Sequence, residues 1–396
     1  MTAPMTQALE GLRVLDLTRL LPGAFCSLML ADYGAEVVKI EQPGTGDYNR
    51  GFPPLNVKES GSFLLLNRNK KSLTLNLKSQ RGKEIFLRMV DHADIVLEGF
   101  RPGVMDRLDL QYETLAERNP RLIYCAISGY GQNGPMCEVA GHDLNYMALT
   151  GALQLFGTAG AGPIVPGLSI ADVGGGSLMA AFGILAAVIA RQGNGRGQFI
   201  DISMMDGLVP WLAYHAADFL FARIEPKGGE RPFIGEAPCY NIYTCADEKR
   251  LALGIIEEHF WIRFCETVGR PDLEDKQWPT GEVARHQFDE LAAIFRSEER
   301  DRWVRRLMDV DVPVSPVNGM EDAFRNPQLR HRKMLLHLEH PVEGRIPQLG
   351  FPIKFSQTPG RLKSPPPLLG EHTDDVLREI GYDAEAVADF REQGVV

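Results

Sequence analysis

The chain has 396 residues, of which 44% are hydrophobic and 24% charged. These values are typical of a soluble globular enzyme with a large domain and a second one, and they exclude a disordered or fibrous chain. The net charge is −10, from 42 Lys and Arg against 52 Asp and Glu. This balance argues against general affinity for nucleic acid or anionic membranes, so an anionic ligand must meet a local basic cluster.

Targeting and membrane signals are not evident in the sequence. The N-terminal MTAPMTQALEGL has neither a basic start nor an apolar stretch, so we predict no secretory signal. The longest apolar run, at 178–190, is shorter than the ~20 residues that a membrane span requires, and we expect a buried helix there. The 6 cysteines include no C-x-x-C pair, which suits reduced thiols in a cytosol. We therefore predict a cytoplasmic protein with no membrane partner.

The first part of the chain alternates between predicted strands and helices. The expected strands are LRVLDL (12–17), EVVKIE (36–41), SLTLNL (72–77), DIVLEG (94–99) and LIYCAISG (122–129), and helical patterns lie between them. Such alternation predicts a parallel, doubly wound sheet. No G-x-G-x-x-G follows the first strand and no G-x-x-x-x-G-K-[ST] occurs, which argues against NAD and ATP as ligands.

The pattern changes past residue 212. An alternating stretch from 231 to 255 predicts a hairpin with the turn ADEK, and helical patterns follow at 257–269 and 289–310. We interpret residues ~225 to 325 as a second, α+β domain. The tail at 351–383 reads as a Pro-rich connector followed by a terminal helix.

Basic residues concentrate in the first domain, close to the ends of the predicted strands. They are Arg68, Lys70, Lys71, Lys78, Arg101 and Arg107. Taken singly, each is best explained as solvated surface charge. As a group they lie where α/β folds bind ligands, and a nucleotide with several phosphates would need such a set.

With one residue between, Asp172 precedes three consecutive glycines and a long apolar helix. An N-cap aspartate, which stabilises a helix by about 1 kcal/mol, is the simplest interpretation. Three consecutive glycines exceed the need of a cap, and their use is to let another molecule approach the main chain. A carboxylate beside N–H donors that can hold an oxyanion is the arrangement that acyl chemistry requires. These residues alone leave both interpretations open.

Together these stretches resemble the class III CoA-transferase (CaiB/BaiF) family over essentially the whole chain. LEGLRVLDLTRLLPGAFCSLMLADYGAEVVKIEQPGTGD resembles its N-terminal signature, and NRNKKSLTLNLKSQRGKE resembles its adenosine-binding segment. EGFRPGVMDRLDL, NPRLIYCAISGYGQNGP, the Asp172 segment, GRGQFIDISMMDG and LGEHTDDVL also fit.

The resemblance implies an α/β fold with a large Rossmann-like domain, whose parallel sheet is built from both chain ends. Residues 1–224 would form most of this domain, 225–325 the smaller α+β domain, and 326–396 the return linker and the end of the large domain. It also implies an interlocked homodimer and an acyl-CoA substrate, with no metal and no cofactor beyond the CoA moiety.

The CoA site implied by the resemblance lies on the large domain. Its expected residues are Leu75, Lys78, Phe100 and Arg107 at matching positions, together with the basic residues Arg68, Lys71 and Arg101. Gln42 departs from the family, in which an arginine is frequent after KIE.

His142 would decide between the two chemistries of the family. In the transferases, the aspartate matching Asp172 attacks an acyl-CoA and becomes an aspartyl-CoA thioester; in the 2-methylacyl-CoA racemases it is one of two bases at the carbon alpha to the thioester. Racemase-like members carry G-H-D-[IL]-N-Y and A-I-E-x-x-F segments, which GHDLNY and GIIEEHF resemble. A histidine opposite a carboxylate suits proton transfer in both directions.

We therefore predict a cofactor-free racemase that works by 1,1-proton transfer through an enolate. Asp172 would serve one face of the alpha carbon and His142, oriented by Glu257, the other. Backbone N–H groups near Asp172 and Gly174 would hold the enolate oxygen, with Tyr240 in GEAPCY as a further support. The alternatives are a CoA-transferase with Asp172 as nucleophile and a catalytically silent CoA-binding protein.

Overall fold

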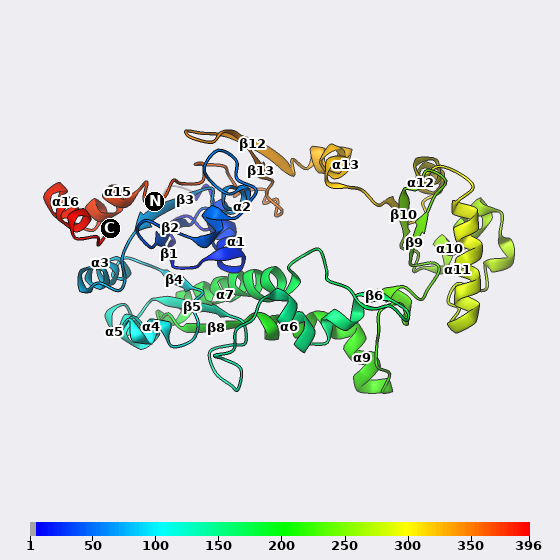
Figure 1. The fold of residues 1–396 in the computed structure, drawn as a ribbon, viewed down its shortest axis with the longest axis horizontal. Coiled ribbons are helices and arrows are strands. Elements are labelled where there is room, and N and C mark those ends of the chain that lie inside the picture. The colour runs from blue at the N-terminus through cyan, green and yellow to red at the C-terminus, as the bar shows by residue number, and fades with distance from the viewer. Residues whose placement is uncertain (1–4) are drawn as a thin grey trace. The chain divides into compact units, whose positions relative to one another are not determined.

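The computed structural model describes residues 5–396, which divide into two compact units (Figure 1). Unit 1 comprises the chain up to Met147, Ser169–Trp211 and Pro327–Val396; unit 2 comprises Ala148–Leu168 and Leu212–Asn326. Unit 2 thus contains more than the predicted segment 225–325. The additional residues are chiefly 148–168 and 212–224. The main chain of 148–168 closely approaches Gly228 and Gly229, and the Gly228 N–H donates to the Gln154 carbonyl oxygen at 3.0 Å.

A parallel sheet forms the centre of unit 1, as the sequence predicts, in the strand order β3-β2-β1-β4-β5-β8. Its strands are β1 (Arg13–Asp16), β2 (Glu36–Glu41), β3 (Lys70–Thr74), β4 (Ile95–Glu98), β5 (Ile123–Ser128) and β8 (Phe199–Ser203). The chain leaves β1 toward β2 on one side and later returns to β4 on the other. The carboxyl ends of β1 and β4 therefore form a topological switch point, which is where open α/β sheets bind ligands.

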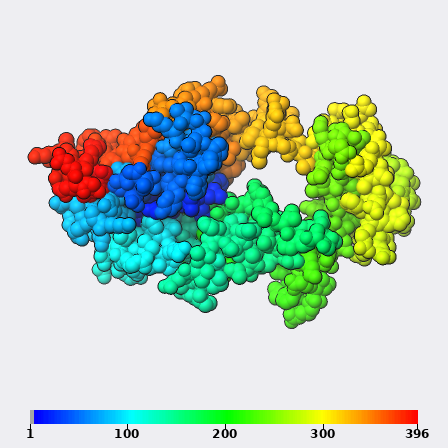
Figure 2. Space-filling view, in the orientation of Figure 1, coloured from blue at the N-terminus to red at the C-terminus, as the bar shows by residue number. Residues whose placement is uncertain are grey.

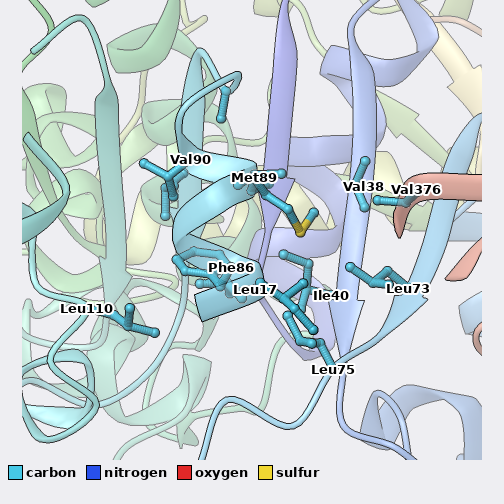
Figure 3. Packing of buried hydrophobic residues seen from close by; sticks show 14 of the residues in the cluster. Leu17, Val38, Ile40, Leu73, Leu75, Phe86, Met89, Val90, Leu110 and Val376 are labelled. Atoms are coloured by element: carbon cyan, nitrogen blue, oxygen red, sulfur yellow. The ribbon is translucent and has the colours of Figure 1, made fainter. Parts of the chain in front are cut away.

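Helices α1 (Leu20–Asp32), α3 (Gln80–Val90), α4 (Val104–Arg107) and α5 (Tyr112–Arg118) connect these strands. In α3, buried apolar side chains recur at helical spacing, and the Ser79 side chain caps the first turn by accepting from the Gly82 N–H. Phe86 and Met89 of α3 pack toward Leu73 of the sheet (Figure 3). Full burial of each such side chain contributes about 1.5–3 kcal/mol to the free energy of unfolding.

The C-terminal segment completes unit 1 through β12 (Leu335–His340), β13 (Gly344–Leu349), α15 (Thr373–Glu379) and α16 (Ala384–Glu392). It lies beside the N-terminal strands (Figure 2), where the Ser72 N–H donates to His372 Nδ1 at 3.2 Å and the Asn76 N–H to the Val395 carbonyl oxygen at 2.8 Å. The β12–β13 hairpin was not predicted, and the expected terminal helix is two short ones.

The long apolar segment is helical from Ala171 to Asn194. Its first part, η3 (Ala171–Leu178), is a π-helix, and α7 (Met179–Asn194) continues it. By length and composition alone this helix could cross a membrane, but half of its most apolar window is buried inside the protein. It packs against α1 and against α8 (Met204–Leu208), and core helices of soluble proteins meet the same criterion.

Unit 2 contains the predicted hairpin of β9 (Ile242–Thr244) and β10 (Arg250–Leu253), joined in one antiparallel sheet by β11 (Val314–Pro316). Helices α10 (Glu258–Val268), α11 (Gly281–Phe295) and α12 (Arg300–Asp309) supply its aromatic core, which includes Trp261 and Trp303. The remaining helices and strands are α2 (Gly61–Leu66), α6 (Asp143–Leu149), β6 (Gly157–Thr158), β7 (Gly162–Pro163), α9 (Ala213–Ala222), α13 (Met320–Arg325) and α14 (Pro327–His331). Short 3-10 turns are η1 (Tyr48–Gly51), η2 (Ala152–Leu155), η4 (Val209–Leu212), η5 (Pro232–Ile234) and η6 (Pro271–Leu273).

Candidate active site

A pocket of 540 Å³ opens in unit 1 at the carboxyl ends of β1 to β4. Residues that follow these strands line it, among them Arg19, Gln42, Tyr48, Leu75, Lys78, Phe100 and Arg107. Four of these, Leu75, Lys78, Phe100 and Arg107, are residues that the sequence predicts for a CoA site. Because the pocket also lies at the topological switch point, we take it as the candidate nucleotide site.

The charge of this pocket is positive. Arg19, Lys78 and Arg107 line it, and none of them forms an ion pair within residues 5–396. Its one carboxylate, Glu41, is 5% exposed and binds Arg50 at 2.8 Å. Burial raises the pKa of Glu41, but hydrogen bonds from Arg50 and the charge of Lys39 outweigh burial and hold that pKa below its usual value. Gln42, which follows β2, adds no positive charge to the pocket. Arg19, which follows β1, supplies the cation on this side.

Two of the predicted basic residues lie elsewhere. The guanidinium of Arg68 is 2% exposed and binds both carboxylate oxygens of Asp32, at 2.9 and 2.6 Å. Lys71 ion-pairs with Glu36 at 2.7 Å and with Glu379 at 2.9 Å. Neither residue lines the pocket. Their N–H donors, which a phosphate would need, are already bound to carboxylates of the protein. Arg101 lines a separate cavity of 240 Å³ beside Glu98.

Asp172 and His142 come from separate segments and belong to the same unit. Asp172 lies in the first turn of η3, and its N–H donates to Asp143 Oδ1 at 3.0 Å, which ties η3 to the start of α6. His142 directly precedes α6, is exposed, and accepts the Asn145 N–H with its carbonyl oxygen at 2.8 Å. Neither the Asp172 carboxylate nor the His142 ring forms a hydrogen bond within the described residues of unit 1.

The electrostatics of Asp172 are unusual for an aspartate. Burial and, to a smaller extent, the carboxylate of Asp143 raise the pKa of Asp172 to about 6, against an opposing effect of His142. Next to it, the Tyr146 hydroxyl donates to the Gly141 carbonyl oxygen at 2.6 Å, and burial and the Asp172 charge raise the pKa of that phenol. A carboxyl group with this pKa exchanges a proton readily near neutral pH.

The three glycines after Asp172 serve packing. A Cβ on Gly175 would lie 2.2 Å from the Met204 carbonyl oxygen, and one on Gly174 would lie 2.6 Å from the Trp211 ring. The glycines therefore let η3 approach α8 and its neighbours closely, and the interpretation that they also open the main chain to another molecule stays a prediction. The Asp172 N–H donates to Asp143, and the role of Gly174 toward the enolate oxygen stays a prediction.

Glu257 and Tyr240 belong to unit 2. Glu257 is exposed and precedes α10, while Tyr240 packs edge-on against Phe233 with ring centroids 5.5 Å apart. Tyr240 lines an apolar cavity of 740 Å³ in this unit. Their roles toward His142 and the enolate stay predictions. Across residues 5–396 no group of three or more His, Cys, Asp or Glu side chains is arranged to hold a metal ion.

Sequence reasoning missed three residues at these sites: Arg19, Asp143 and Tyr146. Each has a sequence signal, because Arg19 follows the first strand by three residues and the other two lie in the GHDLNY segment. Their functional positions depend on packing between distant segments, which the local pattern does not contain.

Comparison with known proteins decides the family. The model of CoA-transferase family III matches residues 9–373. The chain belongs to CoA-transferase family III. The resemblance drawn from the sequence motifs is thereby confirmed.

Members of CoA-transferase family III with different activities are similar to this chain. Succinyl-CoA:glutarate CoA-transferase of Homo sapiens is 34% identical over 395 residues, covering 98% of this chain and 90% of that protein. Alpha-methylacyl-CoA racemase of Mus musculus is 35% identical over 400 residues, covering 98% and 97%. The crystal structure of a CaiB/BaiF family protein from Brucella suis superposes with a TM-score of 0.82 at 30% identity, covering 95% of this chain and 100% of that one.

Proposed function

We propose that this protein is a 2-methylacyl-CoA racemase or epimerase that transfers a proton at the carbon alpha to the thioester without a cofactor. The observation that carries the proposal is that Asp172, whose pKa is raised to about 6, lies in one unit with His142, which acts electrostatically on that carboxyl group. Racemisation needs a proton acceptor and a proton donor whose pKa values allow both directions. An imidazole and a carboxyl group with a pKa near neutral satisfy that need.

The reaction moves one proton between the two faces of the alpha carbon. One of the two groups removes the alpha proton, and the electron pair of the C–H bond moves into the thioester to form an enolate. The other group, already protonated, delivers its proton to the opposite face of the same carbon. The C–H bond is restored with inverted configuration, and the enzyme has exchanged the protonation states of Asp172 and His142.

The CoA moiety would bind in the pocket at the carboxyl ends of β1 to β4. Three cations without ion pairs in the described chain, Arg19, Lys78 and Arg107, suit its phosphates, and the Phe100 ring suits the adenine. Glu257 as the group that orients His142 and Tyr240 as a support of the enolate rest on the motif resemblance.

Deuterium incorporation tests the reaction. A 2-methylacyl-CoA is incubated with the protein in heavy water, and loss of the alpha proton signal is followed by NMR. We expect exchange with the wild type and a reduction of roughly 10²- to 10⁴-fold in His142→Ala for one enantiomer, since that is the typical contribution of a positioned acid or base. His286→Ala serves as the control, because that side chain is 77% exposed on α11.

Full racemisation by His142→Ala would contradict the proposal. So would a wild type that shows no exchange and instead passes CoA to a free carboxylic acid.

A CoA-transferase is the second candidate, favoured by the near-equal identity to transferase and racemase relatives. Asp172 has a carboxylate without a hydrogen bond in unit 1, and such a group can also attack a thioester carbonyl. Incubation with acyl-CoA and hydroxylamine would then convert Asp172 to a hydroxamate, which peptide mass spectrometry detects. A racemase leaves Asp172 unmodified in this experiment.

We further propose that the protein is a homodimer. Phe182 and Ile189 of α7 are 72% and 69% exposed, and Tyr214 and Phe221 of α9 are 82% and 88% exposed. Apolar surface of this extent usually marks a protein interface. Light scattering after size exclusion should give twice the mass of one chain, and Ile189→Glu should shift it toward a single chain. A wild type of single-chain mass at micromolar concentration would overturn the proposal.

A further inference from the structure

Arg19 is held between two aromatic rings at the mouth of the unit 1 pocket. Its guanidinium carbon lies 4.9 Å from the Tyr48 ring centroid and 5.6 Å from that of Phe100, and its Nη1 donates to the Tyr48 hydroxyl at 2.8 Å. Cation–π contacts and one hydrogen bond orient the guanidinium without neutralising its charge. The described chain provides no carboxylate partner for it, so its remaining N–H donors are open to a ligand.

The main chain on both sides of Arg19 is fixed by a buried ion pair. Lys39 and Asp47, both with fully buried side chains, lie 2.8 Å apart. Lys39 Nζ donates to the Thr18 carbonyl oxygen at 2.9 Å, and Asp47 Oδ1 accepts the Leu20 N–H at 3.1 Å. Leu20 has a φ of +63°, a conformation that a leucine adopts only when its surroundings hold it.

The same buried pair also places Tyr48, because Asp47 precedes it and caps the short turn in which it lies. Lys39 and Asp47 therefore hold both Arg19 and the ring on which it stacks. A surface arginine without function needs no such support. This arrangement is typical of a binding residue that is positioned before its ligand arrives.

We infer that Arg19 binds the diphosphate of the CoA moiety. Arg19 follows β1 and Phe100 follows β4, so the guanidinium stands at the switch point, where the diphosphate of a nucleotide lies in open α/β sheets. Lys78 follows β3 and lies farther along the strand order, which leaves it for the 3′-phosphate of the ribose. This inference rests on the proposed CoA substrate, and it adds a residue and a phosphate assignment to it.

Binding of CoA and 3′-dephospho-CoA, measured by calorimetry, tests the assignment. We expect Arg19→Gln to weaken binding of both compounds by the same factor, roughly tenfold or more, since a charge-assisted contact is lost in each case. Tyr48→Phe, which removes only the hydroxyl that orients the guanidinium, should weaken both by a few-fold. Arg88→Gln is the matched control, because Arg88 stacks on Tyr382 at 4.7 Å and does not line the pocket.

Each outcome has a distinct meaning. Equal affinity of wild type and Arg19→Gln would overturn the role of Arg19, and a loss seen with CoA but not with 3′-dephospho-CoA would overturn the diphosphate assignment. If Arg19→Gln unfolds, judged from its melting temperature, Arg19→Lys provides the comparison, with an intermediate loss expected for both compounds. A wild type that binds neither compound would refute the proposed CoA substrate and not this residue assignment in particular.

Discussion

The cations of unit 1 fall into two groups with opposite surroundings. Arg50, Arg68, Lys39 and Lys70 are at least 92% buried, and each is bound to carboxylate or carbonyl oxygens of the protein. Arg19, Lys78 and Arg107 line the pocket and form no ion pair in the described chain. A buried cation that loses its partner is strongly destabilising, whereas an exposed one contributes little to stability. The first group therefore holds the fold and the second is available to a ligand.

The carboxylates of unit 1 also divide into those with a cation partner and those without one. Burial tends to raise the pKa of Asp47, but the charge of Lys39 outweighs burial and holds that pKa below its usual value. Asp172 has no cation of this kind, and its pKa rises to about 6. Unit 1 thus holds unpaired cations along its pocket and, in η3, a carboxyl group without a cation of this kind, and both kinds of group are ones that the fold alone does not need.

Arg68→Ala should produce the largest effect. It leaves the Asp32 carboxylate buried without its bidentate partner, and breaking such a pair lowers the free energy of unfolding by roughly 3–5 kcal/mol. Urea denaturation at neutral pH measures the loss. CoA affinity of the folded protein should stay unchanged, because Arg68 does not line the pocket.

The double variant Arg68→Met/Asp32→Asn sharpens this test, since removing both charges relieves the uncompensated one, and it should be more stable than Arg68→Ala. If Arg68→Ala were as stable as the wild type, or were stable but bound CoA weakly, Arg68 would belong with the cations that are available to a ligand.

The sequence could predict the parallel sheet, the hairpin of unit 2 and four pocket residues, because strand alternation and family motifs are local properties. The sequence could not tell that Arg68 is buried in an ion pair whereas Lys78 lines the pocket, because both residues stand in the same basic stretch. Only the packing of α1 brings Asp32 to Arg68. For the same reason the sequence could not show the packing role of the glycines after Asp172: the contact of Gly175 with Met204 joins segments that are 29 positions apart in the chain.

Asp172→Asn should stabilise the protein at neutral pH. The carboxyl pKa is about 6 in the folded state against an ordinary value of 3.8, so well below pH 3.8 both states are protonated and the group has no effect. As the pH rises toward 6, the unfolded chain ionises first and stability falls; above that range the loss is complete. The Asn variant avoids this loss, which we estimate at roughly 1–3 kcal/mol.

The measurement is the difference in free energy of unfolding between Asp172→Asn and wild type at several pH values. The difference should be near zero at about pH 3, grow up to about pH 6 and then stay constant. An Asn variant that is less stable at neutral pH would mean that a cation holds the Asp172 carboxylate, and the division among carboxylates would fail.

Lys78→Gln should give the smallest effect on stability and still a measurable one on binding. Lys78 is exposed and without an ion pair in the described chain, so its loss should change the free energy of unfolding by less than about 0.5 kcal/mol. CoA binding should weaken by roughly 3- to 10-fold at low salt. The difference from the wild type should shrink at high salt, because salt screens the lysine charge in the wild type.

Lys83→Gln is the control, because Lys83 lies near Lys78 in the sequence but ion-pairs with Asp109 at 2.8 Å and does not line the pocket. Equal CoA affinity in Lys78→Gln and Lys83→Gln would show that lack of an ion pair does not by itself identify the binding cations, and the pocket would then depend on Arg19 and Arg107.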